Sequence, residues 1–414
     1  MRFAIHQVQP ARSTLYYGFL FFICFLGGAV GGTVSTLMSV YLPVVMDELQ
    51  LQSSGDLLVR AGAYINALFI FGWALGGFSW GVVSDIMGRK KAVVLAITWY
   101  GLFTLLTGFA ESWWMIVLCR FLSGFGVGGV LVTTITLVSE VWPPKNRAVV
   151  IGILSIAFPV GIFSAGLINY LVASWREAFL VGLIPLGLAL AGAAFINESD
   201  NWLKNRDEPT TKENGYALFS HGHRKELVTG SLLFGSMLIG LWAIFSWLPT
   251  WVQTLVTDTD GQKERGIVMM LLGMGGLTGG FFSGWLLNRF KIRNVMLTCF
   301  GVASLMSFIL FKTNQHFHPL VYAEVGIMAF FFGISQGALS SYIPPLFSTG
   351  VRARATGFCF NIGRLVTGTA VLFVGILVTT LGGYGNAIYT FSLVFVLGFF
   401  VVLFTAKPDK KLNT

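Results

Sequence analysis

The chain has 414 residues, of which 55% are hydrophobic and only 11% are charged. A soluble globular chain carries about 25% charged residues, so this composition excludes a water-soluble enzyme. The formal net charge of +9 would point to nucleic acid in a soluble protein, whereas in a membrane protein its distribution along the chain decides its meaning.

Twelve apolar runs, each of roughly 18 residues or more, are long enough to cross a bilayer as helices. The predicted spans lie near 15–43, 61–84, 91–110, 113–141, 147–172, 179–196, 227–254, 266–287, 294–312, 319–343, 353–379 and 386–405. A single long hydrophilic stretch separates the sixth span from the seventh. We therefore expect an all-α polytopic membrane protein with an N-terminal six-helix bundle (1–196), a cytoplasmic linker (197–226) and a C-terminal six-helix bundle (227–414).

Lysine and arginine are distributed unevenly between the two sides of the predicted membrane. With the N-terminus inside, 20 of the 27 lie on inner segments and five on outer loops, while Arg120 and Arg364 fall inside spans. Inner loops of membrane proteins are enriched in these cations, so both termini should be cytoplasmic and no nucleic-acid partner is needed. Short loops and the absence of a targeting signal favour a bacterial inner membrane.

The two predicted bundles repeat each other. A glycine-rich string that ends at Asp85 recurs with the same spacing in a string that ends at Asn288, 203 residues later. A Pro-Pro pair followed by Arg147 is echoed by a Pro-Pro pair followed by Arg352. Two bundles in the same orientation imply a parallel pseudo-repeat, with a binding site at mid-membrane between them.

The second span ends in a G-x-x-x-D-x-x-G-R-K-K string that contains Gly81, Asp85, Gly88 and Arg89. This pattern is typical of a helix end that runs into a tight glycine turn, where Asp85 can accept hydrogen bonds and the cations meet anionic headgroups. With this motif the chain resembles the major facilitator superfamily over its full length.

Two further strings lie on the fourth span. Arg120 opens an R-x-x-x-G-x-G-x-G pattern, which is similar to a motif of the superfamily. Glu140 to Arg147 form an E-x-x-P-x-x-x-R pattern, which resembles the signature shared by the sugar porters and the organic-ion branch. The string E-S-D-N-W-L after the sixth span is similar to the P-E-S-P-R-W-L of those groups, without its Pro and Arg. The string P-P-L-F-S-T-G-V-R that ends at Arg352 resembles P-E-L-F-P-T-x-V-R, with Pro345 in place of the Glu.

This resemblance implies a cytoplasmic gate that holds the outward-open state. The residues that match it are Gly81, Asp85, Gly88, Arg89, Glu140, Arg147 and Arg352. Because Pro345 and Asn288 replace acidic residues, the second-half part of the gate should be weaker. The alternative is that these residues only fix topology and helix ends.

Arg364 is the strongest candidate for substrate contact. It lies 12 positions after Arg352, which is roughly 18 Å above the inner surface at 1.5 Å rise per residue, and its first-half equivalent is Pro159. An arginine at this depth must be paired or face a wet cavity, and no carboxylate lies deep in any predicted span. We therefore expect the substrate to supply the anion through a bidentate carboxylate contact, unless Arg364 bonds to backbone carbonyls instead. The surrounding segment also resembles metabolite, sialate and aromatic-acid symporters, where an arginine here is associated with acidic substrates.

Four more residues are candidates for the wall of the substrate site: Asn361, Gln336, Trp242 and Trp247. Asn361 lies one turn from Arg364 on the same helix face. Packing in the core or against lipid is the alternative for each aromatic. Pro249, close after Trp247, could break the seventh helix and form an outer gate.

Proton coupling requires a membrane carboxylate or another titratable group. The candidates are Glu140, Glu324 and Arg120, and the first span carries no charge. Arg120 has a structural alternative, in which a neighbouring backbone accepts its hydrogen bonds. Uniport therefore stays open beside proton symport.

The histidines and cysteines offer no cofactor site. The five His fall in loops or tails, the four Cys lie in apolar segments, and no CxxC, HExxH or Walker pattern occurs. We expect no cofactor and no metal. The expected partners are a small, anionic substrate, the lipid bilayer and a proton, for a protein that works as a monomer.

Together these features predict a secondary transporter that moves a small organic anion, a carboxylate or sugar acid, by alternating access with proton symport. A neutral sugar or polyol porter is the alternative within the same fold. A non-transporting membrane sensor or binding protein is the alternative of another class, and an enzyme is not expected.

Overall fold

The computed structural model of the chain describes residues 13–49, 55–205, 224–257, 259–347 and 352–405. Within these ranges the regular structure is helical and contains no strand. Twelve helical segments are long and apolar enough to span a membrane. The predicted all-α polytopic architecture is therefore confirmed.

Six membrane segments make up the first half of the molecule. They are α1 (Thr14–Glu48), α2 (Gly55–Met87), α3 (Arg89–Gly108), α4 (Trp113–Val141), α5 with α6 (Pro144–Ser155, Ala157–Leu171), and α7, η2 and α8 (Trp175–Ala178, Phe179–Gly182, Leu183–Phe195). The short helix α9 (Asp200–Asn205) follows, inside the segment predicted as the linker.

The second half repeats this order. Its segments are α10 (Arg224–Leu255), α11 (Gln262–Arg289), α12 with the π-helical turn η4 (Ile292–Phe308, Ile309–Thr313), α13 with η5 (Leu320–Tyr342, Pro344–Leu346), α14 (Arg352–Ile376), and α15 with α16 (Tyr384–Ser392, Val394–Thr405). Each predicted span corresponds to one of these segments, although several helices extend well beyond the apolar run that predicted them.

Proline has different effects in the fifth and seventh membrane segments. The fifth segment divides into α5 and α6 at Ile156, three residues before Pro159, whose ring clashes with the carbonyl of the preceding turn and which lacks an amide hydrogen. By contrast, α10 continues through Pro249 as one helix. The predicted break in the seventh helix does not occur.

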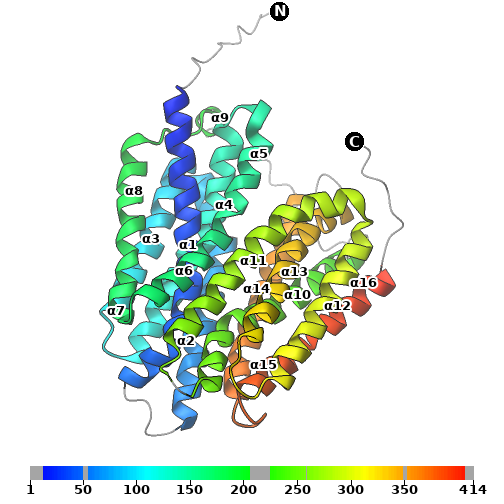
Figure 1. Cartoon of the computed structure of the whole chain (residues 1–414). Helices are drawn as coiled ribbons and strands as arrows, with labels where there is room; N and C mark the ends of the chain where they lie inside the picture. Colours follow the sequence, from blue (N-terminus) through cyan, green and yellow to red (C-terminus); the bar gives the residue numbers. More distant parts are fainter. Residues whose placement is uncertain (1–12, 50–54, 206–223, 258, 348–351, 406–414) are drawn as a thin grey trace, which may run out of the picture.

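Figure 1 shows the two halves side by side, with α9 near the beginning of α1 and with α7 and α15 at the opposite end. We call the end where α1 begins the inner end and the other the outer end. The two halves meet along α2 and α14, α6 and α11, and α1 and α10.

Glycine allows very close helix packing within the first half. A methyl group on Gly72 or Gly76 would lie 2.0 Å from the carbonyl oxygen of Phe121 or Phe125 on α4. Gly72 and Gly76 lie four residues apart on one face of α2, the small-xxx-small spacing that permits such close helix packing. The same spacing on α11 does not mark close packing, because Gly280 and Gly284 have no described neighbour within 4 Å of an added methyl group.

The halves are packed tightly toward the outer end. A methyl group on Gly166 of α6 would lie 2.5 Å from the carbonyl oxygen of Gly266 on α11. Asn66 of α2 donates to the Ser246 carbonyl of α10 at 3.2 Å, and the Gln262 side chain donates to the Asn169 carbonyl at 2.7 Å. These contacts join the two halves at the outer side of mid-membrane.

Candidate functional site

Arg364 lies on α14 at the contact between the two halves. Its Nη1 atom donates to Asn361 Oδ1 at 3.1 Å, and its guanidinium carbon lies 5.1 Å from the ring centroid of Trp73 on α2. Asn361 is buried, and Gly77 of α2 packs directly against its amide. Among the residues that the structure describes, no carboxylate lies within ion-pair distance of Arg364. Within the described part of the chain, the guanidinium thus has one side-chain hydrogen bond and an aromatic face, but no counter-ion.

Aromatic rings from three helices surround this position. The Trp73 ring stacks on Phe158 of α6 at 5.4 Å and meets Trp242 of α10 edge-on at 5.1 Å, and Trp242 contacts Phe245 at 5.7 Å. We call Arg364, Asn361, Trp73 and Trp242 the central cluster. Its members come from both halves, so a ligand bound there would contact both.

The other two candidate wall residues lie elsewhere. Trp247 is fully buried toward the outer end, where its indole nitrogen donates to the Val371 carbonyl at 3.3 Å and its ring packs against Gly62 and Gly375. Gln336 on α13 has a buried side-chain nitrogen without a hydrogen-bond partner among the described residues. Trp247 therefore packs the outer contact between the halves, while Gln336 retains an unused donor.

Arg120 is held in a different way from Arg364. It is 1% exposed, its Nη1 and Nη2 atoms donate to the Val34 and Ser35 carbonyls of α1 at 2.8 and 3.4 Å, and it lies 3.9 Å from the Phe69 ring centroid. Backbone carbonyls and an aromatic face thus take the place of a counter-ion. This geometry favours the structural alternative for Arg120.

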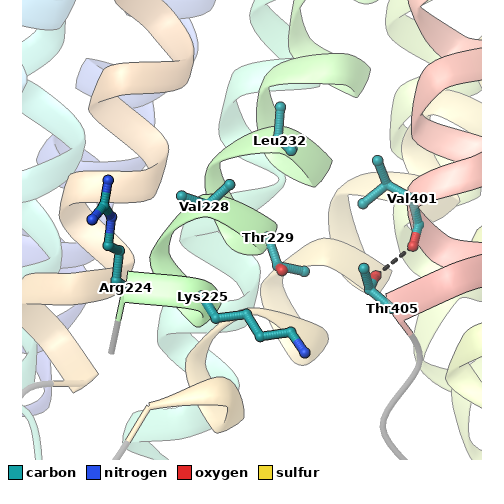
Figure 2. Close-up of a pocket in the computed structure, with 7 residues that line it drawn as sticks. All are labelled: Arg224, Lys225, Val228, Thr229, Leu232, Val401 and Thr405. Atoms are coloured by element: carbon teal, nitrogen blue, oxygen red, sulfur yellow. Dashed lines mark hydrogen bonds between the residues drawn. The ribbon is translucent and has the colours of Figure 1, made fainter. Parts of the chain in front are cut away.

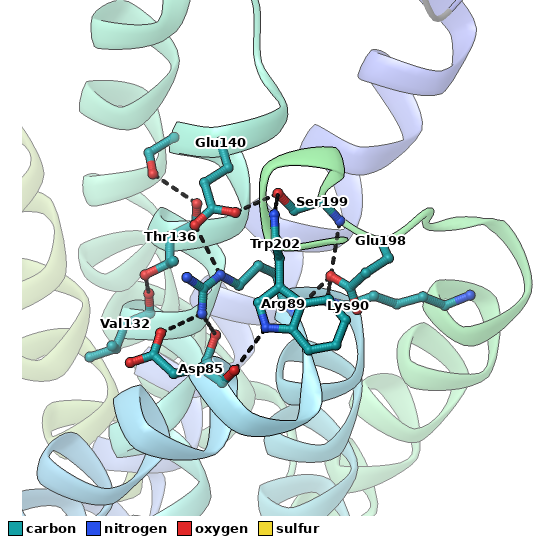
Figure 3. A network of polar contacts seen from close by, with 11 residues as sticks. Asp85, Arg89, Lys90, Val132, Thr136, Glu140, Glu198, Ser199 and Trp202 are labelled. Atoms are coloured by element: carbon teal, nitrogen blue, oxygen red, sulfur yellow. Dashed lines mark hydrogen bonds and ion pairs between the residues drawn. The ribbon is translucent and has the colours of Figure 1, made fainter. Parts of the chain in front are cut away.

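A polar network occupies the inner end of the first half (Figure 3). Arg89 donates to Asp85 Oδ1 at 2.6 Å and to Glu140 Oε1 at 2.9 Å, and Ser199 donates to the other oxygen of Glu140. Glu198 Oε1 accepts the backbone amides of Arg89 and Lys90 at 2.7 and 3.0 Å. A carboxylate at the N-terminus of α3 satisfies amides that have no intrahelical partner and interacts favourably with the helix dipole.

Gly88 makes this arrangement possible. Its backbone lies in the left-handed region with φ of +101°, and an added methyl group would come within 2.3 Å of Glu198 Oε2. Either condition alone favours glycine. Trp202 of α9 completes the network by donating from its indole nitrogen to the Asp85 carbonyl at 2.8 Å.

Two predicted gate residues, Arg147 and Gly81, lie outside this network. Arg147 donates twice to the Trp142 carbonyl, at 3.1 and 2.9 Å, rather than to Glu140. Gly81 has open space around it. Arg352 begins α14, and its side chain lies outside the described residues.

Glu324 belongs to a small polar group at the outer end. Asn314 donates from Nδ2 to Glu324 Oε2 at 2.7 Å, and its Oδ1 lies 2.6 Å from His318 Nε2. Since an amide oxygen can only accept, His318 is the donor in the second contact. Two titratable side chains are thus joined through one amide.

One of the cations counted on the outer side is buried. Arg265 lies in the first turns of α11 and is 2% exposed, with hydrogen bonds to the Gln253 side chain and to the Asp260 carbonyl at 2.8 Å. It lines an outer cavity of about 530 Å³ between α1 and α10, together with Thr250.

Trp73, Glu198, Ser199 and Trp202 were not among the predicted site residues. The last three fall on the E-S-D-N-W-L string, whose similarity to a family motif was the available signal. Trp73 carried none, because its neighbours Arg364 and Trp242 are distant in the sequence and only the packing of α2 against the second half brings them together.

Comparisons with known proteins agree with this architecture. The family model described as "Major Facilitator Superfamily" matches residues 20–358. The chain is 26% identical over 388 residues to the "Probable 4-methylmuconolactone transporter" of Cupriavidus pinatubonensis, covering 90% of this chain and 86% of that protein. It is 26% identical over 373 residues to the "Cis,cis-muconate transport protein" of Acinetobacter baylyi, covering 86% of each. The inward open structure of the xylose transporter XylE from E. coli superposes with a TM-score of 0.78 at 16% identity, over 96% of this chain and 98% of that one.

Proposed function

Because the chain belongs to the Major Facilitator Superfamily, we propose that it carries a small organic anion, a carboxylate or sugar acid, across the membrane by alternating access. Membership makes it a multi-pass transporter rather than an enzyme. The observation that carries the choice of substrate is Arg364, a guanidinium between the two halves with no carboxylate partner among the described residues.

An anionic substrate fits the chemistry of the central cluster. A carboxylate can bind the planar guanidinium through two parallel hydrogen bonds, which a hydroxyl group cannot do. Asn361 already uses one donor of Arg364 and fixes its orientation, while Trp73 and Trp242 offer aromatic surface to the remainder of the substrate. The names of the muconate and methylmuconolactone transporters support the same substrate class.

The neutral sugar alternative receives less support. The likeness to the xylose transporter is at 16% identity and concerns the fold alone. A neutral sugar would leave the Arg364 charge without a counter-ion in the membrane, which is costly.

Uptake into liposomes is the direct test. Purified protein would be given labelled carboxylates, sugar acids and neutral sugars, with and without an inward proton gradient. We expect saturable uptake of an acid by the wild type. Binding without flux would instead support the membrane sensor, and uptake restricted to neutral sugars would overturn the anion proposal.

The Arg364→Gln variant tests the assigned residue. A hydrogen bond to a charged group contributes about 1.5–3 kcal/mol, so losing the bidentate contact should lower acid uptake at subsaturating concentration by about 10- to 100-fold. Arg176→Gln is the matched control, because Arg176 pairs with Glu48 at the outer end. Unchanged uptake by a folded Arg364→Gln protein would contradict the assignment.

We propose that proton coupling uses Glu140 or Glu324, and Arg120 stays the third candidate although its contacts with α1 favour a structural role. Glu140 sits between Arg89 and Ser199, and Glu324 is linked to His318 through Asn314. Replacement of the coupling residue by Gln should abolish acceleration by the proton gradient while counterflow exchange of labelled substrate continues. A wild-type uptake rate that is the same with and without the proton gradient would instead indicate a uniporter.

The remaining assignments complete the proposal. Positive-inside topology places both termini and the 197–226 linker in the cytoplasm of a bacterial cell, with bundles at 1–196 and 227–414. We propose that the monomer is the working unit, because the central cluster is complete within one chain.

A further inference from the structure

A groove runs along the second half of the molecule, between α10, α14 and α16. It consists of two adjoining cavities of about 520 Å³ each, which share Arg224, Val228 and Leu232. Figure 2 shows its mouth, where the first turns of α10 face Val401 and Thr405 of α16. The groove lies apart from the central cluster and has no part in the transport mechanism described above.

The walls of the groove are largely apolar and face the bilayer. Val228, Leu232, Val366 and Leu397 line it and are between 42% and 53% exposed. In hydrocarbon there is no water to fill such a groove, and an empty one would lose the packing contacts of its walls. The flexible acyl chains of the surrounding lipids can fill it.

Two cations lie at the inner mouth of the groove. Arg224 and Lys225 are the first two residues of α10, both are exposed, and neither forms an ion pair with another described residue. In Figure 2 they lie on opposite sides of α10, with the Lys225 amino group toward the α16 side. The hydroxyl of Thr229 lines the same cavity, and the described part of its lining contains no acidic side chain. The mouth therefore combines positive charge with a hydroxyl group at the depth where a helix enters the headgroup region.

We propose that this groove binds an anionic phospholipid from the leaflet at the inner end. The phosphodiester would lie at Lys225 and Thr229 in the mouth, with Arg224 adding positive charge from the other side of α10, and an acyl chain would lie along Val228 and Leu232 toward Ile239. Lysine and arginine near a membrane surface each attract anionic lipid by about 1 kcal/mol. A soluble phosphate could use the cations but would leave the apolar groove uncovered, so a lipid satisfies both parts of the surface.

The position of the groove predicts an effect on transport. Its deep end is lined by Gly235 of α10 and Gly363 of α14, and an added methyl group on Gly235 would lie 3.9 Å from the Gly363 Cα atom. Gly363 directly precedes Arg364. An acyl chain held between α10 and α14 would stabilise the distance between the helices that carry Trp242 and Arg364. Anionic lipid should therefore increase the transport rate.

The test compares lipids on the full-length protein. Wild type would be equilibrated in nanodiscs of phosphatidylcholine with about one fifth phosphatidylglycerol, and the retained lipids would be identified by native mass spectrometry. We expect preferential retention of one phosphatidylglycerol. The Arg224→Gln/Lys225→Gln variant lacks both interfacial cations. Its preference for phosphatidylglycerol over phosphatidylcholine should therefore be about 10- to 30-fold weaker than that of the wild type.

Two further variants separate the groove from general surface charge. Lys145→Gln removes an exposed cation at the inner end of the first half and should leave the preference unchanged. Leu232→Trp keeps both cations but fills the groove, and should lower retention of the lipid. Thermal unfolding of each variant verifies that it is folded.

Three outcomes would overturn the proposal. The first is a wild-type protein that retains both lipids equally. The second is an equal loss of preference with Lys145→Gln, which would indicate general electrostatic attraction. The third is release of phosphatidylglycerol by millimolar inorganic phosphate with no effect of Leu232→Trp, which would assign the cations to a soluble anion.

Discussion

At the scale of single residues, two arginines inside the membrane show that the same side chain can be satisfied in two ways. Arg120 donates to two carbonyls of α1 and rests on Phe69. Arg364 has one amide partner and the face of Trp73, with no described counter-ion. Both Nη atoms of Arg120 are bonded and only its buried Nε lacks a partner among the described residues, whereas Nη1 alone of Arg364 forms a described side-chain hydrogen bond.

Trp73 should therefore matter for substrate binding although it carries no charge. A cation–π contact contributes about 0.5–2 kcal/mol, so Trp73→Leu should raise the half-saturation concentration for the acid by about 2- to 30-fold. Initial rates of uptake measure this change. Trp114→Leu is the control, because Trp114 is 59% exposed and lies on α4. Equal affinity in Trp73→Leu and wild type would remove Trp73 from the site.

Gly88 allows a stability prediction. Gly88→Ala forces an alanine to adopt φ near +101° and brings its methyl group against the Glu198 carboxylate. A residue held in such a conformation costs about 1–3 kcal/mol, so the thermal unfolding midpoint in detergent should fall. Gly187→Ala, within α8 and without a neighbour inside 4 Å, should be neutral or slightly stabilising. A similar midpoint for both variants would contradict the strain argument.

At the scale of elements, the network at the inner end fastens α2, α3, α4 and α9 together, and its two ion pairs differ in exposure. Asp85 is 71% exposed, whereas Arg89 and Glu140 are 14% and 19% exposed. Water and salt screen the first pair more than the second, and exposed pairs contribute about 0–1 kcal/mol.

Charge removal should therefore have unequal effects. Asp85→Asn should alter the unfolding midpoint little and leave substrate preference unchanged. Arg89→Gln should lower the midpoint more, because it leaves the half-buried Glu140 carboxylate without its cation. Thermal scans at low and high salt provide the comparison. A larger loss for Asp85→Asn, or a changed substrate preference, would count against the inner network as a gate.

The helices themselves could be predicted from the sequence, since each is an apolar run of membrane length. Details of their ends could not. The division at Ile156 and the continuity of α10 through Pro249 depend on whether neighbouring helices accommodate the proline, which a single-helix pattern does not contain. Arg364 and Asn361 were predictable from spacing along one helix, whereas Trp73 required the packing of α2 against α14.

At the scale of the whole molecule, the described polar contacts between the halves lie toward the outer end. Asn66 donates across the boundary to the Ser246 carbonyl, three residues before Pro249. This contact belongs to the arrangement in which the outer end is closed.

Asn66→Leu should shift the conformational equilibrium toward the state with the outer end open. One hydrogen bond contributes about 0.5–1.5 kcal/mol, so its loss should change the equilibrium constant between the two conformations by about 2- to 10-fold. Distances between spin labels across the outer ends of α2 and α10 would report it. Asn386→Ala is the control, since Asn386 bonds to Lys312 within the second half. Identical distance distributions in Asn66→Leu and wild type would exclude this role.

The neighbourhood of Trp73 and Arg364 also has an optical consequence. An indole 5.1 Å from a guanidinium experiences a local electric field from that charge, and a bound carboxylate would cancel much of it. In a protein reduced from its 12 tryptophans to Trp73 alone, arrival of the anion should displace the emission maximum, whereas a neutral sugar should not. The transporter would then report the charge of its own cargo through intrinsic fluorescence.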